Sequence, residues 1–278
     1  MLPNSRCVLP LALALALAPA ARAQNAVMLR LDPPVGQVSR YRMEIQSWIR
    51  GRMLQADTSL PTFVQIIHVT QTVGSVEGDV RVITTVIDSS RMDAPGMGGM
   101  GQLGQMAGDM LRGQTTTTRV DARGRVLSVE VAPNPNLPPM LAGRMGGATR
   151  GLGRRGEMSL PMRLVHVGES WTDSLNTELG GGRGAPSEAM TSVTYRLERI
   201  ERQGASQLAV ISWNGTMSST PADQASGTTV SGSMSGEFVV DVSAGRLARM
   251  TTEANGQVES QAGGRMPVRT RVTMTLLP

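Results

Sequence analysis

The sequence contains no lysine, and all 27 of its basic residues are arginine. It has a single cysteine, Cys7, two histidines, and only 3% aromatic residues. Because Cys7 lies in an apolar leader, a disulfide framework, a thiol catalyst and a cysteine zinc site are excluded from the mature chain. Few aromatics leave little surface for stacking on bases, and the arginines alternate with acidic residues, as in residues 196–202. Nucleic-acid binding is therefore not expected.

Long hydrophobic runs are also missing beyond the amino-terminal leader. Residues 1–23 combine Arg6, an apolar run over 8–20 and the small-x-small sequence Ala21–Ala23, which predicts a secretory signal peptide cleaved near Ala23. The run is shorter than the roughly 20 residues that a membrane span needs, so an uncleaved anchor is the lesser alternative. Since Cys7 precedes the run, we expect no lipid anchor. The composition suggests a GC-rich bacterial genome, so the expected location is periplasmic or secreted.

Catalytic and metal-binding motifs are missing as well. The sequence has no H-E-x-x-H, no G-x-S-x-G elbow and no P-loop. His68 and His166 each have apolar neighbours and are interpreted as structural, and the three tryptophans, Trp48, Trp171 and Trp213, as sheet core. We therefore predict that the protein is not an enzyme and has neither a cofactor nor a metal site.

The strongest positive signal is alternation of apolar and polar residues with a period of two. In residues 268–277, Val268, Val272, Met274 and Leu276 share one face, while arginines and threonines occupy the other. Similar alternation is found in residues 79–88, 192–200 and 237–242, and Gly-containing turns predict hairpins over 115–131 and 240–253. Half-buried strands with turns between them predict a mainly β protein with curved antiparallel sheets of the open half-barrel type.

The chain also resembles itself. Three pairs of segments occur in the same order, and a glycine aligns within each pair (Gly36 with Gly168, Gly78 with Gly204, Gly124 with Gly245); the segments are 35–45 and 167–177, 63–88 and 190–215, and 115–131 and 236–253. We predict a first β-rich half over 24–131, a Pro/Gly-rich connection over 132–161 and a second half over 162–278. Chance similarity between β-rich segments is the alternative.

A Met- and Gly-rich insert, residues 92–112, interrupts the first half. Its apolar residues recur every three or four positions, which predicts a short helix over 99–112, although each glycine costs about 1 kcal/mol relative to alanine. A second short helix is predicted over 137–146. The insert is interpreted as a helix that covers an apolar surface of the sheet, because methionine adapts to irregular apolar partners. A disordered loop and a soft copper site are the alternatives.

Three stretches carry a family resemblance: "VGQVSRYRMEI", "DARGRVLSVEV" and "LPMRLVHVGESW". Pro161, Val165, Val167, Gly168 and Trp171 match the phrase P-x-x-x-V-x-V-G-x-x-W. The chain thus resembles an uncharacterised, domain-of-unknown-function family of bacterial secreted proteins and lipoproteins, but it lacks their lipid-attachment cysteine. More distantly it resembles LolA-like lipoprotein carriers. That resemblance implies an open curved sheet with helices on its concave side and room for an acyl chain.

These observations predict a non-enzymatic envelope protein that binds a hydrophobic ligand, a lipid or a lipoprotein acyl chain, on the concave face of the sheet. The expected apolar contacts are in the insert: Met97, Met100, Leu103, Met106, Met110 and Leu111. The alternatives are a structural or protein-interaction module with an envelope partner, and a periplasmic copper binder. No transmembrane segment is expected after signal cleavage.

Overall fold

The computed structural model describes residues 25–49, 59–95, 101–134, 149–154, 156–179, 187–219, 228–260 and 264–278. Several predictions lie outside these residues. They are the signal peptide, the helix over 137–146, and the positions of Met97 and Met100.

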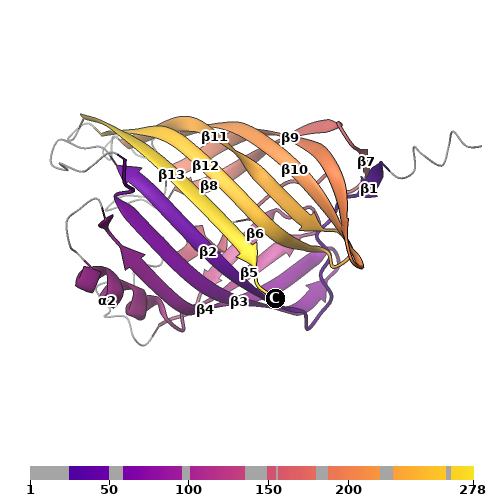
Figure 1. Cartoon of the computed structure of the whole chain (residues 1–278), viewed down its shortest axis with the longest axis horizontal. Coiled ribbons are helices and arrows are strands. Elements are labelled where there is room, and N and C mark those ends of the chain that lie inside the picture. The colour runs from indigo at the N-terminus through magenta and orange to yellow at the C-terminus, as the bar shows by residue number, and fades with distance from the viewer. Residues whose placement is uncertain are drawn as a thin grey trace, which may run out of the picture.

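The described chain folds around one continuous, open antiparallel sheet of 11 strands, in the order β6-β5-β4-β3-β2-β13-β12-β11-β10-β9-β8 (Figure 1). Its strands are β2 (Val38–Ile49), β3 (Phe63–Glu77), β4 (Val80–Asp93), β5 (Thr115–Asp121), β6 (Val126–Val131), β8 (Ser170–Leu179), β9 (Ser187–Gln203), β10 (Ser206–Ser219), β11 (Thr228–Asp241), β12 (Arg246–Ser260) and β13 (Gly264–Leu276). The orange and yellow strands arch over the purple ones in Figure 1. The predicted mainly β, curved antiparallel architecture is confirmed.

The inward face of the sheet forms one hydrophobic core. Along β2, Tyr41, Met43 and Ile45 are buried while the residues between them are more exposed, and along β13 Val272 and Met274 are buried. This alternation follows from the pleat, which sends successive side chains to opposite faces. Each fully buried apolar side chain contributes about 1.5–3 kcal/mol. The face predicted for residues 268–277 is confirmed.

The outer face of the sheet is covered by cross-strand ion pairs. Arg249 lies 2.8 Å from Glu237 on the neighbouring strand, and Arg271 pairs with Glu253 in the same manner. Exposed pairs of this kind contribute roughly 0–1 kcal/mol each, so they do little for stability. They keep the outer face hydrated and balanced in charge, which leaves the inner face as the place for an apolar site.

Two five-stranded meanders, β2–β6 and β8–β12, flank the central strand β13. The predicted hairpins over 115–131 and 240–253 are confirmed by the pairing of β5 with β6 and of β11 with β12. All six aligned glycines have a positive φ, for example 61° at Gly78 and 60° at Gly204. Glycine adopts this left-handed conformation without steric cost. The division into two similar halves stays a prediction.

A separate two-stranded sheet lies at one end of the molecule (Figure 1). Strand β1 (Ala26–Met28) pairs antiparallel with β7 (Leu164–His166). Val27 and Val165 face each other in this pair and are buried, whereas Met28 and Leu164 are exposed. The pair thereby brings the segment before β2 and the segment before β8 together over the core.

The Met-rich insert forms helix α2 (Gly101–Leu111), which confirms the helix predicted over 99–112. β5 pairs with β4 only as far as Val86, and α2 packs against the part of β4 beyond that point. A Cβ added at Gly104 or Gly108 would lie 2.2 Å from a backbone oxygen of β4. The helix thus lies along the edge of the strand, where it takes the place of a neighbouring strand and covers backbone groups that would otherwise be exposed.

The described part of the predicted connection over 132–161 enters the core. We call residues 149–154 and 156–161 the connecting segment. Residues 149–153 are helical and follow the helix predicted over 137–146. Met158, Ser159 and Leu160 are at most 1% exposed, and the backbone N–H groups of Met158 and Leu160 donate to the carbonyl oxygens of Gly124 and Arg123. A sheet with an apolar inner face must bury it, and this segment provides the cover.

Candidate ligand-binding site

The connecting segment does not fill the concave space completely. Among the described residues, three cavities that it borders have volumes of about 340, 100 and 30 Å³. Each has residues of the connecting segment in its wall, with Arg154 in the largest and Gly153 in the other two. The segment therefore divides the space under the sheet into compartments.

The largest compartment, which we call the Trp213 cavity, lies under the second meander and β13. Its wall is mainly apolar and comes from six strands and the connecting segment. It comprises Gly151, Arg154, Gly156, Glu157, Leu175, Thr191, Val193, Tyr195, Trp213, Met217, Met234, Phe238, Met250, Thr252 and Val272. Three of these residues are methionines on adjacent strands. Methionine side chains are flexible and polarizable, so this wall can adapt to an apolar occupant.

A row of aromatic rings borders the cavity. Trp171 stacks on Tyr195 with ring centroids 5.5 Å apart, and Trp213 stacks on Phe238 at 5.7 Å. Tyr195 and Phe238 join the two pairs at 6.5 Å. The indole N–H of Trp171 donates to the carbonyl of Ser159 at 2.7 Å, so the row is also attached to the connecting segment. Trp213 is core, as predicted, whereas Trp48 packs against the guanidinium of Arg269 at 5.0 Å.

The indole of Trp213 lies directly over Gly236, its partner on β11. A Cβ at Gly236 would lie 2.8 Å from the indole nitrogen and 2.0 Å from the carbonyl oxygen of Thr251, so a larger residue does not fit. Within the described residues, neither this nitrogen nor the hydroxyl of Thr191 has a hydrogen-bond partner, and both are buried. A buried unpaired polar group costs about 1–3 kcal/mol. This wall is therefore not optimised for stability alone.

Arg154 and Glu157 contribute charge to the cavity wall. Glu157 accepts a hydrogen bond from the backbone N–H of Val126 at 3.1 Å, and Arg154 Nη1 lies 3.4 Å from its other oxygen. Burial raises the pKa of Glu157, and the nearby charge of Asp121 acts in the same direction; the Val126 N–H and Arg154 oppose the shift. The guanidinium of Arg154, whose contact with Glu157 is long, thus lies beside an apolar space.

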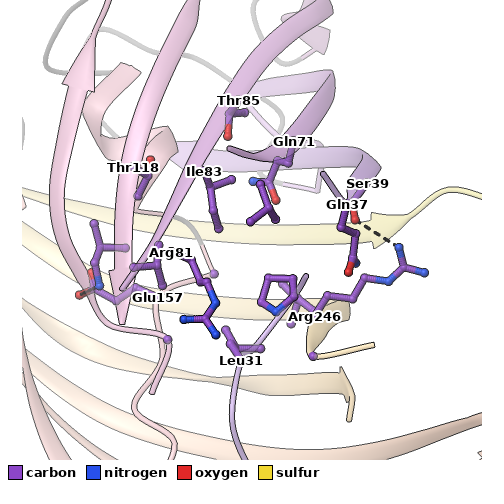
Figure 2. A pocket seen from close by; sticks show the side chains of 18 of the residues that line it. Leu31, Gln37, Ser39, Gln71, Arg81, Ile83, Thr85, Thr118, Glu157 and Arg246 are labelled. Carbon is purple, nitrogen blue, oxygen red and sulfur yellow. Dashed lines mark hydrogen bonds between the residues drawn. The ribbon is translucent and has the colours of Figure 1, made fainter. Parts of the chain in front are cut away.

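The second compartment, the Arg81 cavity, is smaller and more polar (Figure 2). Arg81 donates to Asp32 and to the carbonyl of Gly78, and Arg246 donates to Ser39 at 3.2 Å. Tyr41 donates to the carbonyl of Leu247 at 2.9 Å, and burial raises its pKa to about 12. Within the described residues, the Nε atoms of Arg81 and Arg246 are buried and have no hydrogen-bond partner. Two arginines in the wall of a small cavity make the Arg81 cavity the weaker candidate for an apolar ligand.

A polar cluster anchors the connecting segment to both meanders. The hydroxyl of Ser159 donates to Asp173 on β8, and Arg123, between β5 and β6, reaches the same carboxylate at 3.2 Å. Burial acts to raise the pKa of Asp173, but hydrogen bonds from Ser159 and the Ser174 N–H, with the charge of Arg123, lower it overall. The segment is thereby held beside the aromatic row.

The predicted contact residues lie elsewhere. Met106 is 57% exposed on α2, Met110 is half-buried and Leu111 is in the core; the side chain of Leu103 is outside the description, as are Met97 and Met100. None of the described α2 residues lines the three cavities. A ligand role for the insert stays a prediction. Sequence reasoning missed Met217, Met234 and Met250. Of these, only Met250 lies in a predicted strand, within the hairpin over 240–253.

Among the described helices, none has the length and apolar character to cross a membrane. In the same part of the chain, no three or more histidine, cysteine or acidic side chains gather as metal ligands.

No protein-family model and no curated protein matches the chain. Among solved structures, lipovitellin, studied for its lipid–protein interactions, has a TM-score of 0.45 at 11% identity over 89% of this chain and 26% of its own. The hypothetical lipoprotein YmcC from Escherichia coli has a TM-score of 0.30 at 13% identity over 86% and 83%. The chain spans about a quarter of the lipovitellin chain. Likeness at this level carries no functional argument, and the resemblance to an uncharacterised family stays a prediction.

Proposed function

We propose that the protein is a non-enzymatic component of the bacterial cell envelope that binds a hydrophobic ligand, a lipid or a lipoprotein acyl chain, in the Trp213 cavity. The observation that carries the proposal is a mainly apolar cavity of about 340 Å³ beside the hydrophobic core on the inner face of the sheet. This volume is within the range of small-molecule sites, about 300–1,000 Å³. The envelope location rests on the predicted signal peptide.

The apolar wall of the cavity supports occupancy. An apolar side chain gains dispersion contacts when a hydrocarbon packs against it. The Trp213 cavity is bordered by side chains that gain these contacts from any hydrocarbon, namely Met217, Met234 and Phe238. A bound chain would therefore stabilise the fold as well as be carried by it.

An interaction module is the second candidate, and one observation favours it. Within the described sheet, β8 is an edge strand that pairs only with β9. An exposed edge can accept a strand from a partner protein. This candidate predicts a protein partner and no bound lipid.

The test compares two Met→Glu variants of the full chain. Met234→Glu places a carboxylate in the cavity, and Met106→Glu places one on the exposed side of α2. Because burying an ion costs several kcal/mol, we expect Met234→Glu to weaken binding of an apolar fluorescent probe more than tenfold, with Met106→Glu unchanged. Native mass spectrometry of wild type from its own envelope should show a co-purifying lipid. If only Met106→Glu lost binding, the site would be on the insert.

Folding of each variant is checked by circular dichroism and thermal unfolding. Met217→Glu, on the neighbouring strand and half-buried, serves as a second cavity variant. Wild type that binds no apolar probe and co-purifies with a protein partner instead would contradict the proposal and support the interaction module.

A further inference from the structure

Arg154 is a largely buried charged residue beside an apolar space. It extends from the end of the short helix in the connecting segment into the wall of the Trp213 cavity. Its side chain is only 19% exposed. An arginine held this far from water normally has strong partners, because an unpaired buried charge is costly.

The partners of Arg154 in the described chain are weak. Its Nη1 lies 3.4 Å from the carbonyl oxygen of Val126 and 3.4 Å from Glu157. Good arginine–carboxylate hydrogen bonds are about 2.7–2.9 Å long and often bidentate. The protein forms closer pairs elsewhere, such as Arg119 with Glu77 at 2.6 Å on the surface. Arg154 therefore has binding capacity that its own neighbours do not use.

Glu157 competes poorly for Arg154. Its first oxygen is already engaged by the Val126 N–H at 3.1 Å, and its second is the one that lies 3.4 Å from the guanidinium. Burial and the charge of Asp121 disfavour its ionised form, as the raised pKa shows. An anion entering the cavity from the other side can thus replace Glu157 as the main partner of Arg154, while Glu157 keeps its bond to Val126.

The rest of the wall suits a hydrocarbon chain. From Arg154 the cavity extends along Leu175, Val193 and Met234 toward the aromatic row. One charged end and an apolar remainder match an amphiphile with a single chain, because a second chain would need more than this volume.

We propose that the ligand of the Trp213 cavity is a single-chain amphiphile with an anionic head, a carboxylate or a phosphate, and that Arg154 binds this head. The inference rests on the proposed function and adds the chemical class of the ligand to it.

The test measures binding of four ligands of equal chain length to the full-length protein by calorimetry: an alkanoate, an alkyl phosphate, an alkanol and an alkyltrimethylammonium. Wild type should bind at least one anion about tenfold more tightly than the alkanol, since hydrogen bonds to a charged group are stronger than those between neutral groups. The cation should bind most weakly. Comparison of alkanoate with alkyl phosphate distinguishes a fatty-acid head from a phosphate head.

Three variants separate Arg154 from general charge effects. Arg154→Gln should reduce the affinity for the anion about tenfold and leave the alkanol unchanged. Glu157→Gln should act in the opposite direction and increase anion affinity, because it removes the competing carboxylate. Arg150→Gln is the matched control: it removes the same charge from the same short helix, but Arg150 is exposed and does not line the cavity. It should leave both affinities unchanged.

The outcomes distinguish this inference from the proposed function. If wild type binds all four ligands with equal affinity and Arg154→Gln changes none of these affinities, the ligand has no anionic head that Arg154 binds. The proposal of hydrophobic binding would then still stand. If wild type binds none of them, the proposed function fails as well. Should Arg154→Gln not fold, Glu157→Gln still decides, because unchanged or lower anion affinity in that variant overturns the inference.

Discussion

The α2 helix and the connecting segment have similar compositions and opposite environments. Both are rich in glycine, and the connecting segment, like α2, includes a short helical stretch. Yet α2 lies at the outer edge of β4, with Met106 exposed, whereas the connecting segment lies under the sheet, with Met158 fully buried. The difference comes from the surface that each segment covers. The α2 helix covers a strand edge, and the connecting segment covers the apolar concave face.

The glycines of the two segments do different work. On α2, Gly104 and Gly108 are spaced by four residues and face the backbone of β4. This spacing puts them on the same side of the helix, so the helix axis can approach the strand closely. In the connecting segment, Gly151 faces open space, and a Cβ at Gly153 would meet the side chain of Val129 at 2.8 Å. The glycines of α2 therefore allow close packing against the backbone at the edge of the sheet, whereas Gly153 packs against a side chain in the interior.

The largest expected effect is the difference in stability between substitutions of Met158 and Met106. Met158→Ala should lower the free energy of unfolding by about 2–5 kcal/mol, because it removes a fully buried side chain and leaves a void. Met106→Ala should change it by less than about 0.5 kcal/mol, as is usual for exposed positions. Urea unfolding followed by circular dichroism measures both. Equal losses of stability in the two variants would show that Met106 is not exposed on α2 but packs against another part of the protein.

A pair of glycine substitutions gives the second effect. Gly108→Ala forces α2 away from the carbonyl of Ser90, so we expect a loss of about 1–3 kcal/mol, or detachment of α2 seen as faster amide exchange along β4. Gly151→Ala should be neutral or stabilise by up to about 1 kcal/mol, because the site is helical and open. A neutral Gly108→Ala would refute the close contact of α2 with β4.

Local patterns explain which parts of this architecture were predictable. Alternation along residues 268–277 and the glycine turns at Gly78 and Gly245 depend on neighbours in the sequence, so they predicted strands and hairpins that the structure contains. The three- and four-residue spacing in the insert likewise predicted α2. The place of α2 was not predictable, because it depends on where β5 stops pairing with β4 at Val86.

The candidate site depends on longer-range relations. Met217, Met234 and Met250 line one cavity only because β10, β11 and β12 pair in a particular register, with a bulge between β11 and β12 that no short motif shows. The connecting segment resembles a loop in sequence, since its Pro and Gly content is typical of surface connections. Its burial follows from the lack of other cover for the concave face, which is a property of the whole sheet.

The smallest expected effect concerns the charges that the connecting segment, unlike α2, carries into the interior. The pKa of Glu157 is raised mainly by burial. A carboxyl with a raised folded-state pKa contributes stability below its ordinary pKa and loses it as the pH rises through the folded value. Glu157→Gln should therefore equal wild type near pH 4 and become more stable than wild type by up to about 1 kcal/mol at pH 7. Urea unfolding at both pH values measures the change.

Asp109→Asn, on the exposed side of α2, controls for the loss of one negative charge. A Glu157→Gln variant that lost stability on going from pH 4 to pH 7 relative to wild type would show that Arg154 and the Val126 N–H outweigh burial, and that the cation is already well paired without a ligand.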